Sequence, residues 1–144
     1  NSRLQHKFEW VNDDQYEKDR KAKQYSCKGK WVKLADKAYS FLKAYVNQEG
    51  LNLAPEDLKA LAVGFVRQIP VVSDDGGICQ VAAVHNIKCW RTLDLMKLMV
   101  DCGHINVAKV DEVLQYLDQE NDLGMSKADV RTFYCQHFGT KCPL

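Results

Sequence analysis

One stretch decides the fold that this sequence predicts: Ile69-Pro70-Val71-Val72-Ser73-Asp74-Asp75-Gly76-Gly77. Its consecutive valines suit a strand buried on both faces of a parallel sheet, and ligands gather just beyond the carboxyl ends of such strands. Two adjacent carboxylates at that edge repel each other unless a cation, a proton or solvent offsets their charge. Mg²⁺ or Mn²⁺ takes oxygen ligands from one or two carboxylates, so the stretch predicts a metal site. The alternative is an Asp-Asp-Gly turn that only ends the strand.

The composition of the whole chain fits a single globular domain. Its 144 residues are 46% hydrophobic, which is enough to build a core. Twenty basic and nineteen acidic side chains nearly cancel, so the net charge alone does not indicate a nucleic-acid partner. No apolar stretch approaches the length of a membrane span, and we therefore expect a soluble, cytoplasmic protein without a membrane partner.

Six cysteines are spread irregularly through helix-like sequence. A chain of this size does not need disulfides to hold its core, so we expect reduced, buried thiols. A zinc-stabilised domain is an alternative, with His85, Cys89, Cys102 and His104 as its ligands. The sequence contains no Cys-x-x-Cys pair, which weakens the zinc interpretation.

Helical and extended segments alternate along the chain. Apolar spacing and helix-end signals predict helices over residues 3–24, 31–50, 55–68, 78–85, 93–102, 107–118 and 126–138. Ser126 and Asp129 form a capping-box pattern at the start of the last of these. Short strands are expected at 71–75 and 87–90, and strands that alternate with helices predict an α/β domain with a parallel sheet. The apolar helix 93–102 could lie in the core or at a homodimer surface, and we expect it to lie in the core.

A basic segment spans residues 18–33. It sets seven cations against Asp19 alone, interleaved with Tyr25 and Trp31. Such a segment can hold a phosphate backbone and stack an unpaired base. The candidate nucleic-acid ligands are Arg20, Lys21, Lys23, Lys28 and Lys30. The alternative is a solvated linker between two helices that is hinged at Gly29.

The run from Pro55 to Ile105 resembles the C-terminal half of a PIN domain. An Ala- and Leu-rich helix begins with Glu56 and Asp57, and a later strand ends in Ser, any residue, then Asp, at Ser73 and Asp75. The resemblance implies one PIN-like domain over residues 1–144 with a three-layer α/β/α fold and a parallel sheet. It also implies a ribonuclease whose clustered acids hold Mg²⁺ or Mn²⁺, often as a toxin controlled by a protein antitoxin.

PIN domains begin with an apolar strand that carries a metal-binding Asp, and this sequence does not open with such a strand. We therefore expect a chain that lacks the N-terminal strand of the family. A catalytically inactive PIN-like module that binds nucleic acid or protein is the alternative to a ribonuclease.

We expect each carboxylate to have a different role in metal-dependent RNA cleavage. Asp75 is the expected direct metal ligand, and Asp57 a direct or water-mediated one, with Glu56 as its alternate. Ser73 would orient Asp75 or a metal-bound water. Asp74 is a weaker third ligand, because successive side chains of an extended segment point to opposite faces. The bound cation would lower the pKa of a water and neutralise charge on the phosphoryl group.

Overall fold

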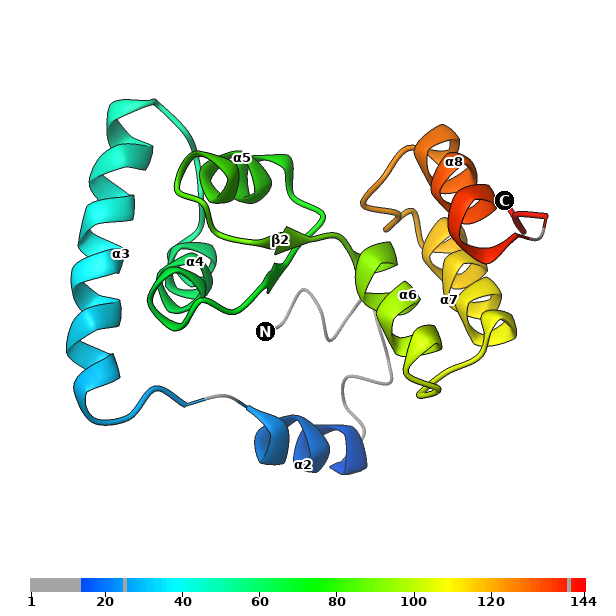
Figure 1. Cartoon of the computed structure of the whole chain (residues 1–144), viewed down its shortest axis with the longest axis horizontal. Coiled ribbons are helices and arrows are strands. Elements are labelled where there is room, and N and C mark those ends of the chain that lie inside the picture. The colour runs from blue at the N-terminus through cyan, green and yellow to red at the C-terminus, as the bar shows by residue number, and fades with distance from the viewer. Residues whose placement is uncertain (1–13, 25, 140) are drawn as a thin grey trace.

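The computed structural model describes residues 14–24, 26–139 and 141–144. Figure 1 shows helices as the dominant elements, joined by a short pair of strands. In chain order the elements are α2 (Asp14–Lys23), α3 (Lys30–Gln48), α4 (Pro55–Arg67), β1 (Val71–Val72), α5 (Gly76–Val84), β2 (Cys89–Trp90), α6 (Thr92–Asp101), α7 (Val107–Gln119) and α8 (Lys127–Phe138).

The predicted three-layer α/β/α, PIN-like fold is wrong. β1 and β2 are parallel, with Val71 opposite Cys89, but across the described residues the sheet has only these two strands of two residues each. So small a sheet cannot separate two helical layers. Both short strands, and the helices on either side of them, lie within or close to the predicted segments. The layers were inferred from the alternation of helix and strand, whereas most apolar residues recur at helical spacing and pack helix against helix.

The first hydrophobic core lies among α3, α4, α5 and the two strands. Leu42, Leu61 and Val81 are fully buried at its centre. Gly64 allows α4 to lie directly on β1, because a Cβ at this position would come within 2.5 Å of a Val71 methyl carbon. This packing fixes the position of β1, and with it the loop that carries Ser73, Asp74 and Asp75.

The second core lies among α6, α7 and α8. Its buried residues include Leu93, Val110 and Tyr134, and they form a cluster separate from the first. The hydroxyl of Tyr134 donates a hydrogen bond to Asp111. In Figure 1 the two cores occupy the two sides of the molecule, and β2 leads from one into α6 of the other.

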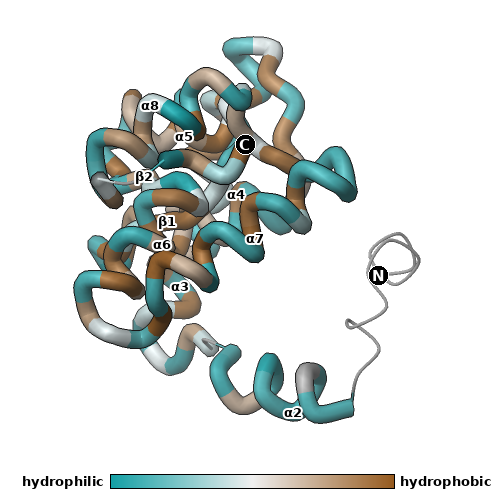
Figure 2. The backbone as a smooth tube through the Cα atoms, turned by 90° about the vertical axis from the view of Figure 1, so that its right-hand side faces the viewer, coloured by the Kyte–Doolittle hydropathy of each residue, from teal (hydrophilic) through white to brown (hydrophobic). Residues whose placement is uncertain are grey.

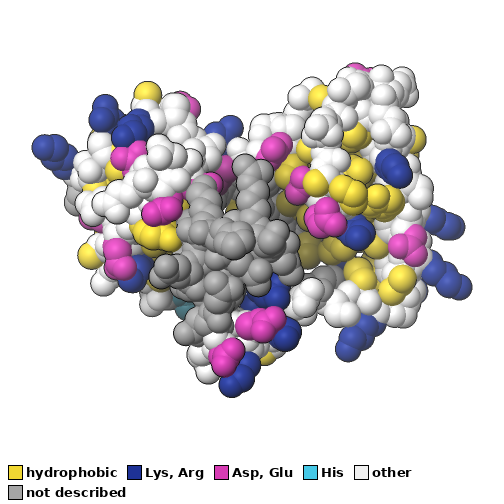
Figure 3. Space-filling model, turned by 180° about the vertical axis from the view of Figure 1, so that it is seen from behind, with side chains coloured by type: hydrophobic (Ala, Val, Ile, Leu, Met, Phe, Trp, Pro, Cys, Tyr) yellow, Lys and Arg dark blue, Asp and Glu magenta, His cyan; other side chains and the backbone are white. Residues whose placement is uncertain are grey.

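α2 differs from the other helices in its polarity. Figure 2 shows it as an almost uniformly hydrophilic helix beside the body of the protein. Apolar side chains are exposed elsewhere, and Figure 3 shows them gathered on the half that contains α3. The large hydrophobic residues of that half with high exposure include Phe41, Phe65 and Val72.

Candidate functional site

Asp75 forms the N-terminal end of α5. Its Oδ1 accepts a hydrogen bond from the backbone N–H of Ile78 at 3.0 Å, and its own N–H donates to Ser73 Oγ at 3.1 Å. A carboxylate at this position satisfies one of the free N–H groups at a helix start and interacts well with the helix dipole. The structure thus gives Asp75 and Ser73 a local structural role. That role is the cap of α5 and not the predicted Asp-Asp-Gly turn, because Gly76 and Gly77 are the first residues of the helix.

Asp57 also accepts a hydrogen bond at a helix start, but as the third residue of a different helix. It lies in the first turn of α4, and its Oδ2 accepts a hydrogen bond from the N–H of Ala54 at 3.3 Å. Glu56 beside it is exposed. Across the part of the chain that the structure describes, no group of three or more His, Cys, Asp or Glu side chains is arranged to hold a metal ion. The Mg²⁺ or Mn²⁺ site at Asp57, Asp74 and Asp75 stays a prediction.

Asp74 connects the two cores. Its Oδ1 accepts a hydrogen bond from the backbone N–H of Thr92 at 3.0 Å, and its Oδ2 accepts one from the Thr92 hydroxyl. Thr92 is the first residue of α6. On the other side lies Gly124, in the loop between α7 and α8, where an added Cβ would be 2.8 Å from Asp74 Cγ. The weakest of the predicted ligands is therefore the most constrained carboxylate of the loop.

The four residues of the zinc alternative have separate surroundings. His85 packs with its ring edge-on to Phe41 and Tyr45, at centroid distances of 5.1 and 4.6 Å. Cys89 contacts another cysteine, while Cys102 and His104 are exposed near the end of α6. The described residues do not gather these four into a metal-binding group. All six thiols are free, but none of them is fully buried, so the expectation of buried thiols is wrong.

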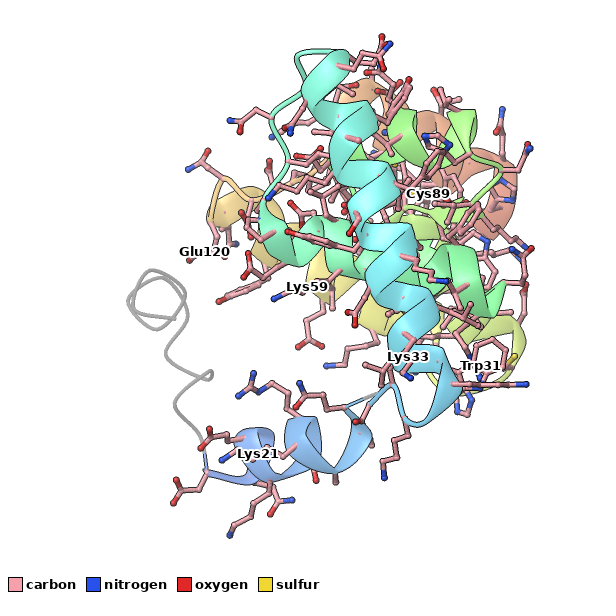
Figure 4. All side chains as sticks on the ribbon, turned by 90° about the vertical axis from the view of Figure 1, so that its left-hand side faces the viewer. Lys21, Trp31, Lys33, Lys59, Cys89 and Glu120 are labelled. Carbon is pink, nitrogen blue, oxygen red and sulfur yellow. The ribbon has the colours of Figure 1, made fainter. Side chains whose placement is uncertain are left out.

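The basic segment divides into paired and unpaired cations. On α2, Arg20 and Lys21 each form an ion pair with Glu17, at 3.6 and 3.2 Å. Lys23 and Lys28 are exposed and form no ion pair with another described residue. Figure 4 shows Lys21 on α2 and Lys33 at the start of α3. Tyr25 lies outside the described residues.

Cations surround Trp31 at the start of α3. The Arg67 Cζ atom lies 4.3 Å from the centre of the ring, and Lys30 Nζ lies 5.1 Å from it. Both distances are typical of cation–π contacts. Arg67 ends α4 and is far from Trp31 in the sequence. Sequence reasoning therefore missed it as a member of this site, because no local pattern joins the two residues.

The first turn of α3 has an unusual charge. It carries Lys30 and Lys33 and no acidic residue, and no side chain caps its N-terminal N–H groups. The N-terminal end of a helix is already positive, so cations there are unfavourable and anions are favourable. Gly29 precedes the helix with φ of 59°, which glycine adopts without strain. The expected break between two helices at Gly29 is confirmed.

No protein-family model, curated protein or solved structure matches the chain in comparisons with known proteins. The resemblance to the C-terminal half of a PIN domain is therefore supported by the sequence motifs alone. Among the helices of the described residues, none is both long enough and apolar enough to cross a membrane.

Proposed function

We propose that this chain binds single-stranded RNA through the basic segment 18–33. The observation that supports the proposal most strongly is the separation of charge. Of the 20 basic and 19 acidic residues, seven basic and one acidic residue fall in this segment, which leaves thirteen basic and eighteen acidic residues elsewhere. A cationic segment on an otherwise acidic chain attracts a phosphate backbone and directs it to one place.

The start of α3 would be the strongest phosphate-binding part of the segment. Lys28, Lys30 and Lys33 stand at the positive end of the helix, where their charges oppose folding of the helix. A bound phosphate would neutralise these charges and accept hydrogen bonds from the free N–H groups of the first turn. Trp31 lies beside them with Arg67 and Lys30 over its indole ring. An unpaired base that displaced one of these cations could stack on the ring.

Salt dependence of RNA binding tests this proposal. We expect the fluorescence anisotropy of a labelled oligouridine to rise on addition of the protein. The logarithm of the association constant should fall with the logarithm of salt concentration with a slope of roughly −2 to −4, as for three to five phosphate contacts on a single strand. Absence of binding, or binding that salt does not weaken, would contradict the proposal.

Metal-dependent RNA cleavage is a second candidate function. One observation favours it: Asp74 and Asp75 follow the carboxyl end of β1, and ligands bind at this edge of parallel sheets. Asp75 is exposed, and its Oδ2 has no hydrogen bond to another described residue. This oxygen is accessible to a hard divalent cation.

Asp75→Asn tests this second candidate. The variant should keep its fold, because the amide oxygen of Asn can still accept the hydrogen bond from Ile78. If Asp75 binds Mn²⁺, cleavage of labelled RNA by the unmodified chain with Mn²⁺ should fall in the variant to the level seen with chelator, while RNA binding is unchanged. This role would be excluded if the variant still cleaves RNA. It would also be excluded if the unmodified chain cleaves RNA equally well without a metal ion.

A further inference from the structure

Two cysteine sulfurs meet next to the loop that follows β1. Cys79 lies on α5 and Cys89 on β2, and their Sγ atoms are 3.0 Å apart. Cys79 Sγ also donates a hydrogen bond to the carbonyl oxygen of Ser73 at 3.5 Å. Both thiols are half-buried, and Cys89, which Figure 4 labels, packs against the first core. Among the described residues, these are the cysteines whose sulfur atoms make contact.

We propose that Cys79 and Cys89 are a reversible oxidation site, which closes to an intramolecular disulfide on reaction with a small disulfide such as oxidised glutathione. A disulfide bond is about 2.05 Å long, so the sulfurs must approach by about 1 Å. We expect rotation about the side-chain bonds of Cys79 to supply this movement. The inference is independent of RNA binding and of metal-dependent cleavage.

The environment of Cys89 assigns the order of the two steps. Burial raises the pKa of Cys89 to about 12, with a further contribution from the hydrogen bond to Cys79. Cys89 therefore keeps its proton at neutral pH, and we assign the first attack to the thiolate of Cys79.

The reaction then proceeds by two exchanges. The Cys79 thiolate attacks one sulfur of oxidised glutathione, forms a mixed disulfide and releases one glutathione thiolate. Cys89 then loses its proton to solvent and attacks the Cys79 sulfur. The Cys79–Cys89 bond forms, and the second glutathione leaves as a thiolate that takes up a proton. Two protein thiols are oxidised and one glutathione disulfide is reduced to two glutathione molecules.

The disulfide would join α5 to β2 across a short segment of chain. Ten positions separate the two cysteines. Closing a loop of this size restricts the unfolded chain, and we expect the midpoint of thermal unfolding to rise by about 5–10 °C on oxidation. The bond would also hold α5 against the sheet next to Ser73, so the loop that carries Asp74 and Asp75 would become more rigid.

Thiol mapping of the oxidised full-length chain tests the proposal. The protein is incubated with oxidised glutathione, its free thiols are alkylated, and its peptides are analysed by mass spectrometry. We expect a peptide pair joined through Cys79 and Cys89, a loss of two hydrogen atoms from the intact chain, and reversal by dithiothreitol. Cys79→Ser and Cys89→Ser should each remove the crosslink and the rise in thermal stability.

A matched variant keeps the test decisive even if either serine variant folds poorly. Cys102→Ser/Cys135→Ser removes two exposed thiols outside the pair, and it should form the Cys79–Cys89 crosslink as readily as the unmodified chain. The proposal is overturned if, in the unmodified chain, Cys79 and Cys89 are still alkylated after the incubation while oxidised glutathione modifies Cys102 or Cys135. It is also overturned if the only disulfides found join two chains.

Discussion

K28Q/K30Q/K33Q should bind single-stranded RNA roughly 10- to 100-fold more weakly than the unmodified chain, because three phosphate contacts are lost. The slope of affinity against salt should become less steep by about two, since each phosphate contact on a single strand contributes about 0.7 to it. Anisotropy titrations of one labelled oligouridine at several salt concentrations measure both quantities.

The same variant should be at least as stable as the unmodified chain. Lys30 and Lys33 lie in the first turn of α3, at the positive end of its dipole. Each positive charge in this position typically costs about 0.3–1 kcal/mol. Removing two of them should at least offset the loss of the contact between Lys30 and Trp31, which is worth about 0.5–1 kcal/mol, so the thermal midpoint should stay the same or rise. Loss of RNA binding without loss of stability would show that these lysines serve binding and not folding.

K109Q/K127Q/K141Q provides the control for charge. It removes the same number of positive charges from the half of the chain that follows α6. Lys109 and Lys127 form exposed ion pairs with Glu112 and Asp118, at 2.5 and 2.7 Å, and exposed pairs contribute little to stability. We expect RNA affinity to change little in this variant. Equal weakening in the two triple variants would mean that binding follows net charge and not the basic segment.

Asp74→Ala should lower the free energy of unfolding by about 1–3 kcal/mol, which is the usual cost of leaving a half-buried polar group without its partner. The variant removes both hydrogen bonds to Thr92 and leaves the first N–H of α6 without an acceptor from the loop after β1. It also opens space against Gly124. Urea unfolding followed by circular dichroism measures the change.

Asp74→Asn separates the hydrogen bonds of Asp74 from its negative charge. The amide oxygen can accept from the Thr92 N–H, and the amide nitrogen can donate to the Thr92 hydroxyl, so most of the stability should be kept. We expect a loss less than half of that in Asp74→Ala. If the two variants lose the same free energy, the negative charge itself stabilises the junction, and the hydrogen bonds to Thr92 are not the cause.

The positions of the helices from α3 to α8 could be predicted because their signals are local. Of the helix expected over residues 3–24, residues 3–13 lie outside the described part of the chain, and the rest contains α2. The apolar spacing from Trp31 onward gave α3, and Ser126 caps α8 as expected, with the N–H of Asp129 donating to its hydroxyl at 3.1 Å. The parallel direction of the two strands was also predicted correctly. The number of layers depends on which segments meet in space, and no local pattern in this chain specified that.

The candidate sites also combine features that local sequence predicts with contacts that depend on the packing of distant segments. That Asp57 lies at a helix start follows from its neighbours in the sequence, and the structure places it there. Asp75 was expected at the end of a strand, whereas the structure makes it the cap of α5. The contacts of Asp74 with Thr92, of Trp31 with Arg67 and of Cys79 with Cys89 join residues from different elements. Each depends on the packing of α4, α5 and α6 around the short sheet, so only coordinates could identify it.

Gly29 has a consequence for how the two basic helices present their charges. A Cβ built on this residue would find no atom within 4 Å. No neighbouring atom therefore restricts the torsions of Gly29, which directly precedes α3. We expect rotation at Gly29 to change the distance between Lys23 and Lys30 to match the spacing of successive phosphates. The protein could then bind RNA strands of different curvature.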